Sequence, residues 1–343
     1  MLKRFMSVLL LLIVSLSAGI VHANPELDSR IQSVLSWLPS DTESISVLRA
    51  PITYDLDSSQ PVDPESVYQS PFVYSLMINA ERDPIDGGIR VPLSDVLLAV
   101  QCAGRWNTGA ANDNAVSRPL AYILFLKQDE TRDAKVQRAL RLHPHRKYSD
   151  AGYTVSELSL QDEEDKDHPP SIIYKCLPQS GVIVEANDSK FLHTILAQMS
   201  TGSKQMRALP DNLPEWKQVN TQAPYWGVRH FQKNDPTSPF GDPAIIGAFF
   251  QHDDQAKGIT FSYDPKIDVL DVGYLSENPN IKSVVDSMVH AEHIATKWGP
   301  TSVQEPEQRS VHFQSTSPPK SWNSALFCVH AWMGCPLPWP YGG

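Results

Sequence analysis

The stretch SIIYKCLPQSGVIVEANDSKFLHTILAQM, residues 171–199, contains the unit that decides the fold. Two short apolar runs, 171–176 and 182–185, flank a turn at 178–181, which predicts a β-hairpin. Asn187 or Asp188 then caps a helix. The apolar side chains of that helix recur at helical spacing, at Phe191, Leu192, Ile195, Leu196 and Met199. A helix with such a stripe needs a sheet or another helix to cover it.

Elements of the same kinds are predicted on both sides of this stretch. Further strands are expected at 44–49, 96–102, 121–127, 152–158, 225–232, 244–251, 258–263, 267–274 and 311–314. Further helices are expected at 131–142, from Asn278 onward, and at 321–333. A first amphipathic helix presents Leu27, Ile31, Val34, Leu35 and Leu38.

These patterns predict an α+β fold, with amphipathic helices packed on one face of one or more mostly antiparallel sheets. Residues 24–205 and 206–335 form two predicted halves, each running from strands into a hairpin and a capped helix. Whether the halves are a duplication is left open. Residues 336–343, PLPWPYGG, form an extended tail, because its prolines exclude a helix or a central strand.

Residues 1–23 have the pattern of an export signal. Lys3 and Arg4 precede an apolar run at 8–16, and Val21-His22-Ala23 supplies a small residue at both positions that determine cleavage. The run is short for a membrane span, so cleavage before Asn24 is expected, with no transmembrane span afterwards. The mature protein is predicted to be periplasmic or secreted.

The charge balance argues against nucleic acid as a partner. The chain carries a formal net charge of −10, and removal of the signal takes away two basic residues. Binding to phosphate groups needs clustered Lys and Arg, which this acidic sequence lacks.

An exported protein is allowed disulfides, and the chain has four cysteines. The favoured pairs are Cys328–Cys335, as a local loop, and Cys102–Cys176, as a long-range link. The alternative is four separate buried thiols. No C-x-x-C motif is present, which argues against a thioredoxin-type redox site.

Several short pieces are similar to those of uncharacterised exported bacterial proteins. Leu38-Pro39-x-Asp41-Thr42-Glu43, leading into a strand, resembles the opening of the DUF3352 kind, and residues 122–199 follow the outline of that family. The pieces Leu213-Pro-Glu-Trp-Lys217 and Trp226-Gly-Val-Arg-His230 resemble a related set of hypothetical bacterial proteins. The resemblance implies no activity, cofactor or catalytic residue.

Motifs of common enzymes are absent from the sequence. It has no G-x-S-x-G and no glycine-rich phosphate loop. Ser317-Pro-Pro-Lys320 matches S-x-x-K only formally, because its prolines prevent the helix that this motif needs.

No metal site or cofactor is predicted. His290 and His293 are three residues apart and lack a placed third ligand, so complementing a helix C-terminus is the simpler role. His143 and His145 follow a basic helix end in the same way. The acidic run 162–167 lacks the spaced ligands and the glycine of a calcium loop.

Aromatic side chains give the candidate interaction surface. Tyr225, Trp226, Arg229 and His230 lie in one predicted strand, and Trp339 and Tyr341 lie in the tail. Tyr and Trp suit recognition because they bury area and keep a polar group. For the strand residues the core is nevertheless the favoured assignment, since alternation sends half of them inward.

The sequence thus favours a non-catalytic exported protein that binds an unknown protein or small ligand in the envelope. The alternative is an envelope hydrolase or metal-dependent enzyme whose residues, Arg229, His230, His290 and His293, meet only on folding. A third option is a structural protein with no ligand of its own.

Overall fold

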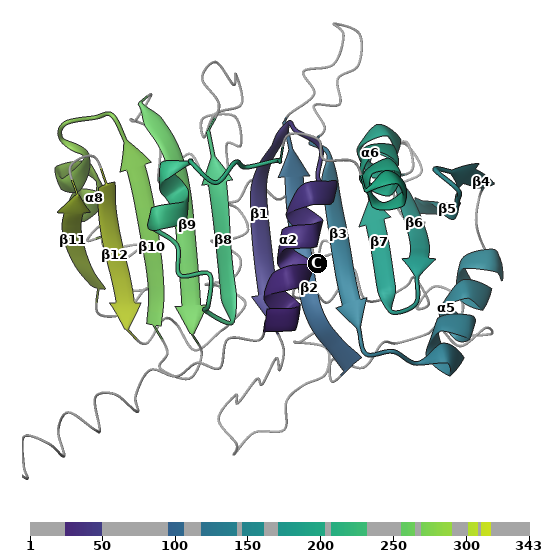
Figure 1. The fold of residues 1–343 in the computed structure, drawn as a ribbon. Helices are drawn as coiled ribbons and strands as arrows, with labels where there is room; N and C mark the ends of the chain where they lie inside the picture. Colours follow the sequence, from purple (N-terminus) through teal and green to yellow (C-terminus); the bar gives the residue numbers. More distant parts are fainter. Residues whose placement is uncertain are drawn as a thin grey trace, which may run out of the picture.

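A computed structural model shows one antiparallel sheet that contains every described strand (Figure 1). It describes residues 25–49, 95–105, 118–142, 146–160, 171–202, 207–231, 255–264, 269–289, 301–307 and 310–316. Within these ranges the sheet has 12 strands in the order β11-β12-β10-β9-β8-β1-β2-β3-β7-β6-β5-β4.

The strands are short to medium in length, and all neighbours run antiparallel. The first seven are β1 Thr42–Arg49, β2 Val96–Gly104, β3 Leu120–Leu126, β4 Arg146–Asp150, β5 Tyr153–Leu160, β6 Ser171–Gln179 and β7 Val182–Ala186. The other five are β8 Tyr225–His230, β9 Ala256–Asp264, β10 Val269–Ser276, β11 Thr301–Glu307 and β12 Ser310–Thr316.

The described helices are few beside this sheet. They are α2 Pro25–Trp37, α5 Glu130–Leu142, α6 Ser189–Thr201, α8 Ile281–Val289 and the 3₁₀ helix η2 Pro214–Lys217.

The predicted α+β class is therefore wrong. The fold is dominated by a single large antiparallel sheet. The amphipathic stripes were identified correctly, but local periodicity does not report how many strands join one sheet. Two strands outside the expected set, β4 and β11, extend this sheet at its two ends.

Strands of both predicted halves lie in the same sheet. β1 is hydrogen-bonded to β2 on one side and to β8 on the other, with Val47 opposite Val100 and Trp226. This β1–β8 pairing joins residues about one hundred and eighty apart in sequence, with register Ser44↔Arg229. Non-local pairing of this kind leaves no local sequence signal.

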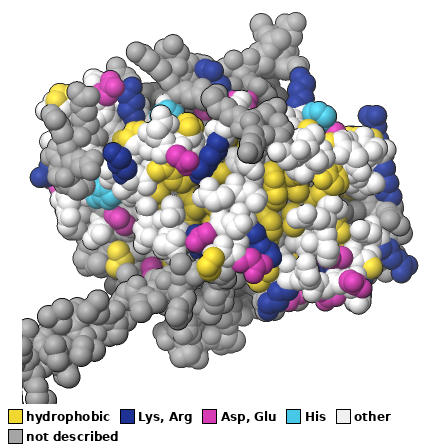
Figure 2. Space-filling view, in the orientation of Figure 1, with side chains coloured by type: hydrophobic (Ala, Val, Ile, Leu, Met, Phe, Trp, Pro, Cys, Tyr) yellow, Lys and Arg dark blue, Asp and Glu magenta, His cyan; other side chains and the backbone are white. Residues whose placement is uncertain are grey.

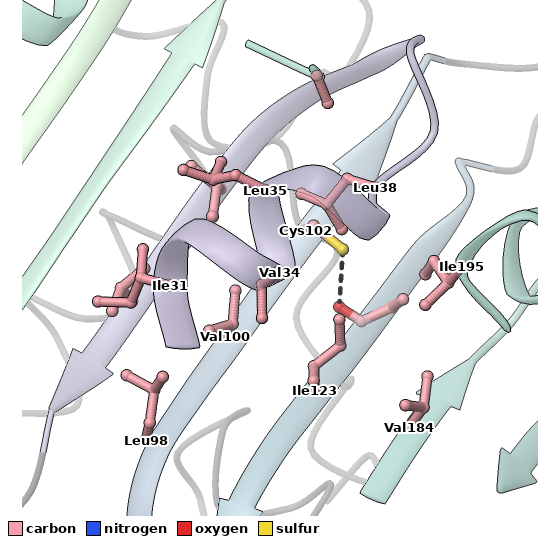
Figure 3. Close-up of a cluster of buried hydrophobic side chains, with 14 of the residues drawn as sticks. Ile31, Val34, Leu35, Leu38, Leu98, Val100, Cys102, Ile123, Val184 and Ile195 are labelled. Carbon is pink, nitrogen blue, oxygen red and sulfur yellow. Dashed lines mark hydrogen bonds between the residues drawn. The ribbon is translucent and has the colours of Figure 1, made fainter. Parts of the chain in front are cut away.

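One face of the central strands packs against α2 and α6 to form the main core (Figure 3). Ile31, Val34 and Leu35 of α2 and Ile195 of α6 lie over Val100, Ile123 and Val184 of the sheet. The set is almost entirely solvent-free; Val34, Val100, Ile123, Val184 and Ile195 are each 0 % exposed. Burial of an apolar side chain of this size contributes roughly 2 kcal/mol.

The predicted hairpin and capped helix are confirmed. β6 and β7 pair antiparallel, and Asp188 caps α6 by accepting a 2.8 Å hydrogen bond from the Phe191 amide. Gly202 ends the helix with φ of 58°, a left-handed conformation that glycine adopts without strain.

The other face of the central strands is also buried but carries polar pairs. Lys175 of β6 lies opposite Glu185 of β7, with 2.8 Å between Nζ and Oε2. Farther along the same row, the Gln101 amide donates to the Tyr122 hydroxyl at 2.9 Å. All residues of β1 are buried, Ser44 and Ser46 on this second face included.

Cys102 and Cys176 are separate buried thiols, so the favoured Cys102–Cys176 disulfide is corrected. β3 and β7 lie between their strands. Three inter-strand steps separate the two cysteine-bearing strands by about 14 Å, whereas a disulfide needs Cα atoms within about 7 Å. The Cys102 thiol instead donates to the Ala121 carbonyl at 3.5 Å (Figure 3).

Several predicted features lie outside the described residues. They are the signal at 1–23, the strand at 244–251, the helix at 321–333, the pair Cys328–Cys335 and the tail 336–343. Among the described helices, none has both the length and the hydropathy to cross a bilayer.

Cys176 is expected to resist alkylation in the folded protein. Burial, followed by the nearby Asp150 charge, raises the pKa of its thiol from 9.0 to about 12. Only the thiolate reacts, so iodoacetamide at mildly alkaline pH should leave the Cys176 peptide unmodified until guanidinium chloride unfolds the chain. Peptide mass mapping measures this directly.

The raised pKa of Cys176 also determines how this thiol changes the folding stability with pH. The unfolded thiol ionises from about pH 9 and the folded one near 12, so this contribution is complete below pH 9 and lost as pH rises toward 12. Rapid native-state labelling of Cys176, or a Cys102–Cys176 linked peptide, would contradict the buried free thiol.

Candidate functional site

A groove opens between α2 and the β6–β7 turn. It has a volume of about 390 Å³. Its lining comes from α2, the end of β3 and the hairpin turn, with Arg30, Ser33, Trp37, Phe125, Leu126, Gln128, Gln179, Ser180, Gly181 and Val182. Figure 2 shows hydrophobic surface on this side of the molecule, beside α2 and over β3 and β7.

Two aromatic rings form one wall of the groove. Trp37 and Phe125 are stacked, with centroids 6.2 Å apart and planes at 23°. The Arg30 guanidinium lies over the Phe125 ring, 5.4 Å from its centroid. Phe125 is only 3 % exposed beneath these two side chains, so the half-buried Trp37 supplies most of the aromatic surface that faces the groove. The wall thus combines an apolar surface with one cation.

Local structure fixes the opposite rim. Gly181 has φ of 70°, and its carbonyl accepts a 2.7 Å hydrogen bond from the Leu126 amide. Asp133 of α5 then holds the turn through one oxygen, which accepts from Ser180 Oγ at 2.6 Å and from the Gly181 amide at 3.1 Å. The rim is therefore preorganised, because both sides of the turn are bonded to neighbouring elements.

A second polar cluster joins η2 to the β8–β9 pair. Glu215 is fully buried, and its Oε1 lies 2.7 Å from Nδ1 of His230, whose side chain is 31 % exposed. Gly258 stands opposite His230 in the β8–β9 pair, and a Cβ there would lie 2.1 Å from Glu215 Oε1. A side chain at position 258 would therefore displace the carboxylate.

Another histidine contacts the same segment. His312 Nδ1 lies 3.3 Å from Asp271 Oδ1, and its Nε2 contacts Gln218 Oε1, the residue that follows η2. Among the described residues, three histidines, His193, His230 and His312, each place Nδ1 against a carboxylate. This pattern fixes ring orientation and joins separate elements, and it does not require a ligand.

The structure places the predicted interaction strand in the core. Tyr225, Trp226 and Arg229 are each 1 % exposed, so they form no surface, and only His230 of that set reaches solvent. Tyr225 packs edge-on against Phe261, with centroids 4.7 Å apart. The core assignment favoured for this strand therefore holds, and the interaction surface considered for Tyr225, Trp226 and Arg229 is wrong. Trp339 and Tyr341 lie outside the described residues.

The alternative hydrolase set does not come together in the described part of the chain. Arg229 and His230 are adjacent in β8 and point to opposite faces. The Arg229 guanidinium lies over Phe231, 4.8 Å from its centroid. His290 and His293 lie outside the described residues, as do His143, His145 and the acidic run 162–167. Within the described ranges, no three His, Cys, Asp or Glu side chains gather around a metal position.

The groove residues were missed at the sequence level. Arg30, Ser33 and Trp37 are spaced i, i+3, i+7, so they share one face of α2 beside the core stripe. That spacing was a usable signal. No such signal could place Phe125 and Val182 in the groove, because their proximity to α2 depends on the order of strands in the sheet.

Two solved structures resemble this chain at low similarity. They are crystal forms I and III of TP0453, at 8 % and 9 % identity, each with a TM-score of 0.45. The similarity covers 86 % of this chain in both cases, and 96 % and 97 % of the TP0453 chains. No family model and no curated protein matches the sequence. The DUF3352-like resemblance stays a prediction.

Replacement of His230 by Ala should destabilise the fold by about 1–3 kcal/mol, because it leaves the buried Glu215 carboxylate without this partner. In a Glu215→Gln background the same His230→Ala change should cost about 1 kcal/mol less, since no charge is left unpaired. Urea unfolding of the four proteins measures the coupling. Equal costs in both backgrounds would show that the pair is not energetically linked.

Proposed function

We propose that the protein is exported and binds a small ligand with a flat apolar body in the groove between α2 and the β6–β7 turn. The observation that carries the proposal is the stacked Trp37–Phe125 wall, which lines an open groove of about 390 Å³. Ligand sites of proteins have volumes from about 300 to 1,000 Å³ and are mostly apolar with a few polar groups.

The polar part of the lining supports a ligand with hydrogen-bonding groups. Gln128 and Gln179 line the groove with neutral amide groups, and the hydroxyls of Ser33 and Ser180, which donate to Ser29 and Asp133, keep lone pairs that can accept from a ligand. Asp133 and the backbone of Leu126 hold the turn that carries Ser180, so the site needs little reorganisation to bind.

The export pattern at residues 1–23 supports action in the envelope or outside the cell. The groove residues belong to the part of the chain that follows this signal. A ligand would therefore be an extracytoplasmic molecule, and the Glu215–His230 pair would act in stability rather than in binding.

Filling the groove should abolish binding of a neutral aromatic probe. The probe is N-phenyl-1-naphthylamine, whose fluorescence rises in apolar sites. Ser33→Trp places a bulky side chain in the lining and should lower the affinity at least tenfold. Ser36→Trp is the matched control, because Ser36 is exposed on the same helix outside the groove lining. Fluorescence titration gives the two dissociation constants.

Equal probe affinity for the Ser33→Trp and Ser36→Trp variants would overturn the groove as the binding site. Thermal unfolding of each variant checks that the fold is intact before the titrations are compared. A Trp37→Ala variant should also weaken the probe, because it removes half of the aromatic wall.

Export should produce a mature chain that begins at Asn24. Expression of the full-length chain in a bacterial host, followed by osmotic release, should give an intact mass that lacks residues 1–23. Replacement of Lys3 and Arg4 by Asp should retain the full-length chain in the cytoplasm. A full-length mass in the periplasmic fraction would contradict signal cleavage.

A further inference from the structure

The groove has the opposite charge character to the rest of the chain. The formal net charge of the protein is −10, yet the groove lining contains Arg30 and no Asp or Glu. The surrounding walls are aromatic, aliphatic or neutral polar. A cation beside an apolar wall attracts an anion more strongly than it would in open water, because the local dielectric constant is lower.

Arg30 is held in place by weak contacts that a ligand can replace. Its Nη2 lies 2.6 Å from Oε1 of Glu26, one turn earlier in α2. The Glu26 side chain is 71 % exposed and lies outside the groove lining. Ion pairs of this exposed kind contribute about 0.2–1 kcal/mol. An anion in the groove can therefore compete for the guanidinium at low cost.

The carboxylate that holds the β6–β7 turn is already engaged. Asp133 is 7 % exposed, accepts hydrogen bonds from Ser180 and Gly181, and lies 3.6 Å from the Arg132 guanidinium. Its charge is directed to the turn and to Arg132, so it opposes an anion beside Arg30 only weakly.

We propose that the natural ligand class is a planar aromatic anion, such as an aromatic carboxylate or sulfonate. Its ring packs against the Trp37–Phe125 wall, and its anionic group pairs with Arg30 in place of Glu26. This inference rests on the proposed groove function and names the chemistry of the ligand. A bidentate contact from the guanidinium would also orient the ring along the wall.

Two probes that differ only in an anionic group test this. They are 1-anilinonaphthalene-8-sulfonate and its neutral counterpart, N-phenyl-1-naphthylamine. Arg30→Gln should raise the dissociation constant of the sulfonate about tenfold, because a charge-assisted contact is lost. It should leave the neutral probe within about twofold, since the aromatic wall is unchanged.

A second variant should change the sulfonate affinity in the opposite direction. Glu26→Gln removes the competing carboxylate and should tighten sulfonate binding by about twofold, with no change for the neutral probe. Arg146→Gln is the control for net charge, because Arg146 is an exposed arginine of β4 outside the groove lining. It should leave both probes unchanged.

The outcomes separate the two proposals. If both probes bind in a Trp37-dependent manner but Arg30→Gln affects neither selectively, the groove function stands and the anion inference fails. If Trp37→Ala and Ser33→Trp leave both probes unaffected, the groove function itself fails. If Arg146→Gln weakens the sulfonate as much as Arg30→Gln, the effect comes from net charge, and the Arg30 contact is overturned.

Discussion

The structure depends on the hydrogen-bonded pairing of β1 with β2 on one side and β8 on the other. This strand is buried throughout its length and joins two sets of strands into one sheet. α2 precedes it through a short connection, and an ion pair of 2.7 Å between Arg49 and Asp28 fastens the far end of the strand to the start of the helix. The position of α2, and with it one wall of the groove, follows from this arrangement.

A sheet of this width must prevent association at its open edges. β4 is a five-residue strand that presents Arg146 and Lys147, and β11 contains Pro306 between two glutamates. Short length, charge and proline are the usual devices that discourage pairing with another chain. In the interior, both side chains of the pair Arg118–Glu43 are fully covered, so removal of either partner would leave a buried charge without its counter-ion.

The proposed binding site lies on a surface that α2 and the sheet leave uncovered. The α2 stripe covers β1 to β3, but the neighbouring face with Arg30, Ser33 and Trp37 stands beside the hairpin turn and leaves a groove. The histidine–carboxylate pairs, by contrast, join elements on the sheet and account for Glu215 and His312 without a ligand. Separation of these two roles makes the mutational tests independent.

Local features were accessible from the chain alone, because helix periodicity, the Asp188 cap and the hairpin turn at Ser180–Gly181 depend on residues a few positions apart. The sequence could not predict the fold class or the order of the 12 strands, because both depend on which distant strands pair. For the same reason it could not show that Cys102 and Cys176 are separate thiols. Core burial was the favoured assignment for the aromatic residues of this strand, but the burial of both of its faces, Arg229 included, could not be foreseen, because alternation predicts a face and not what covers it. The groove likewise forms only when strand pairing brings Phe125 and Val182 to α2. The i, i+3, i+7 spacing of the residues that α2 contributes is visible in the sequence alone.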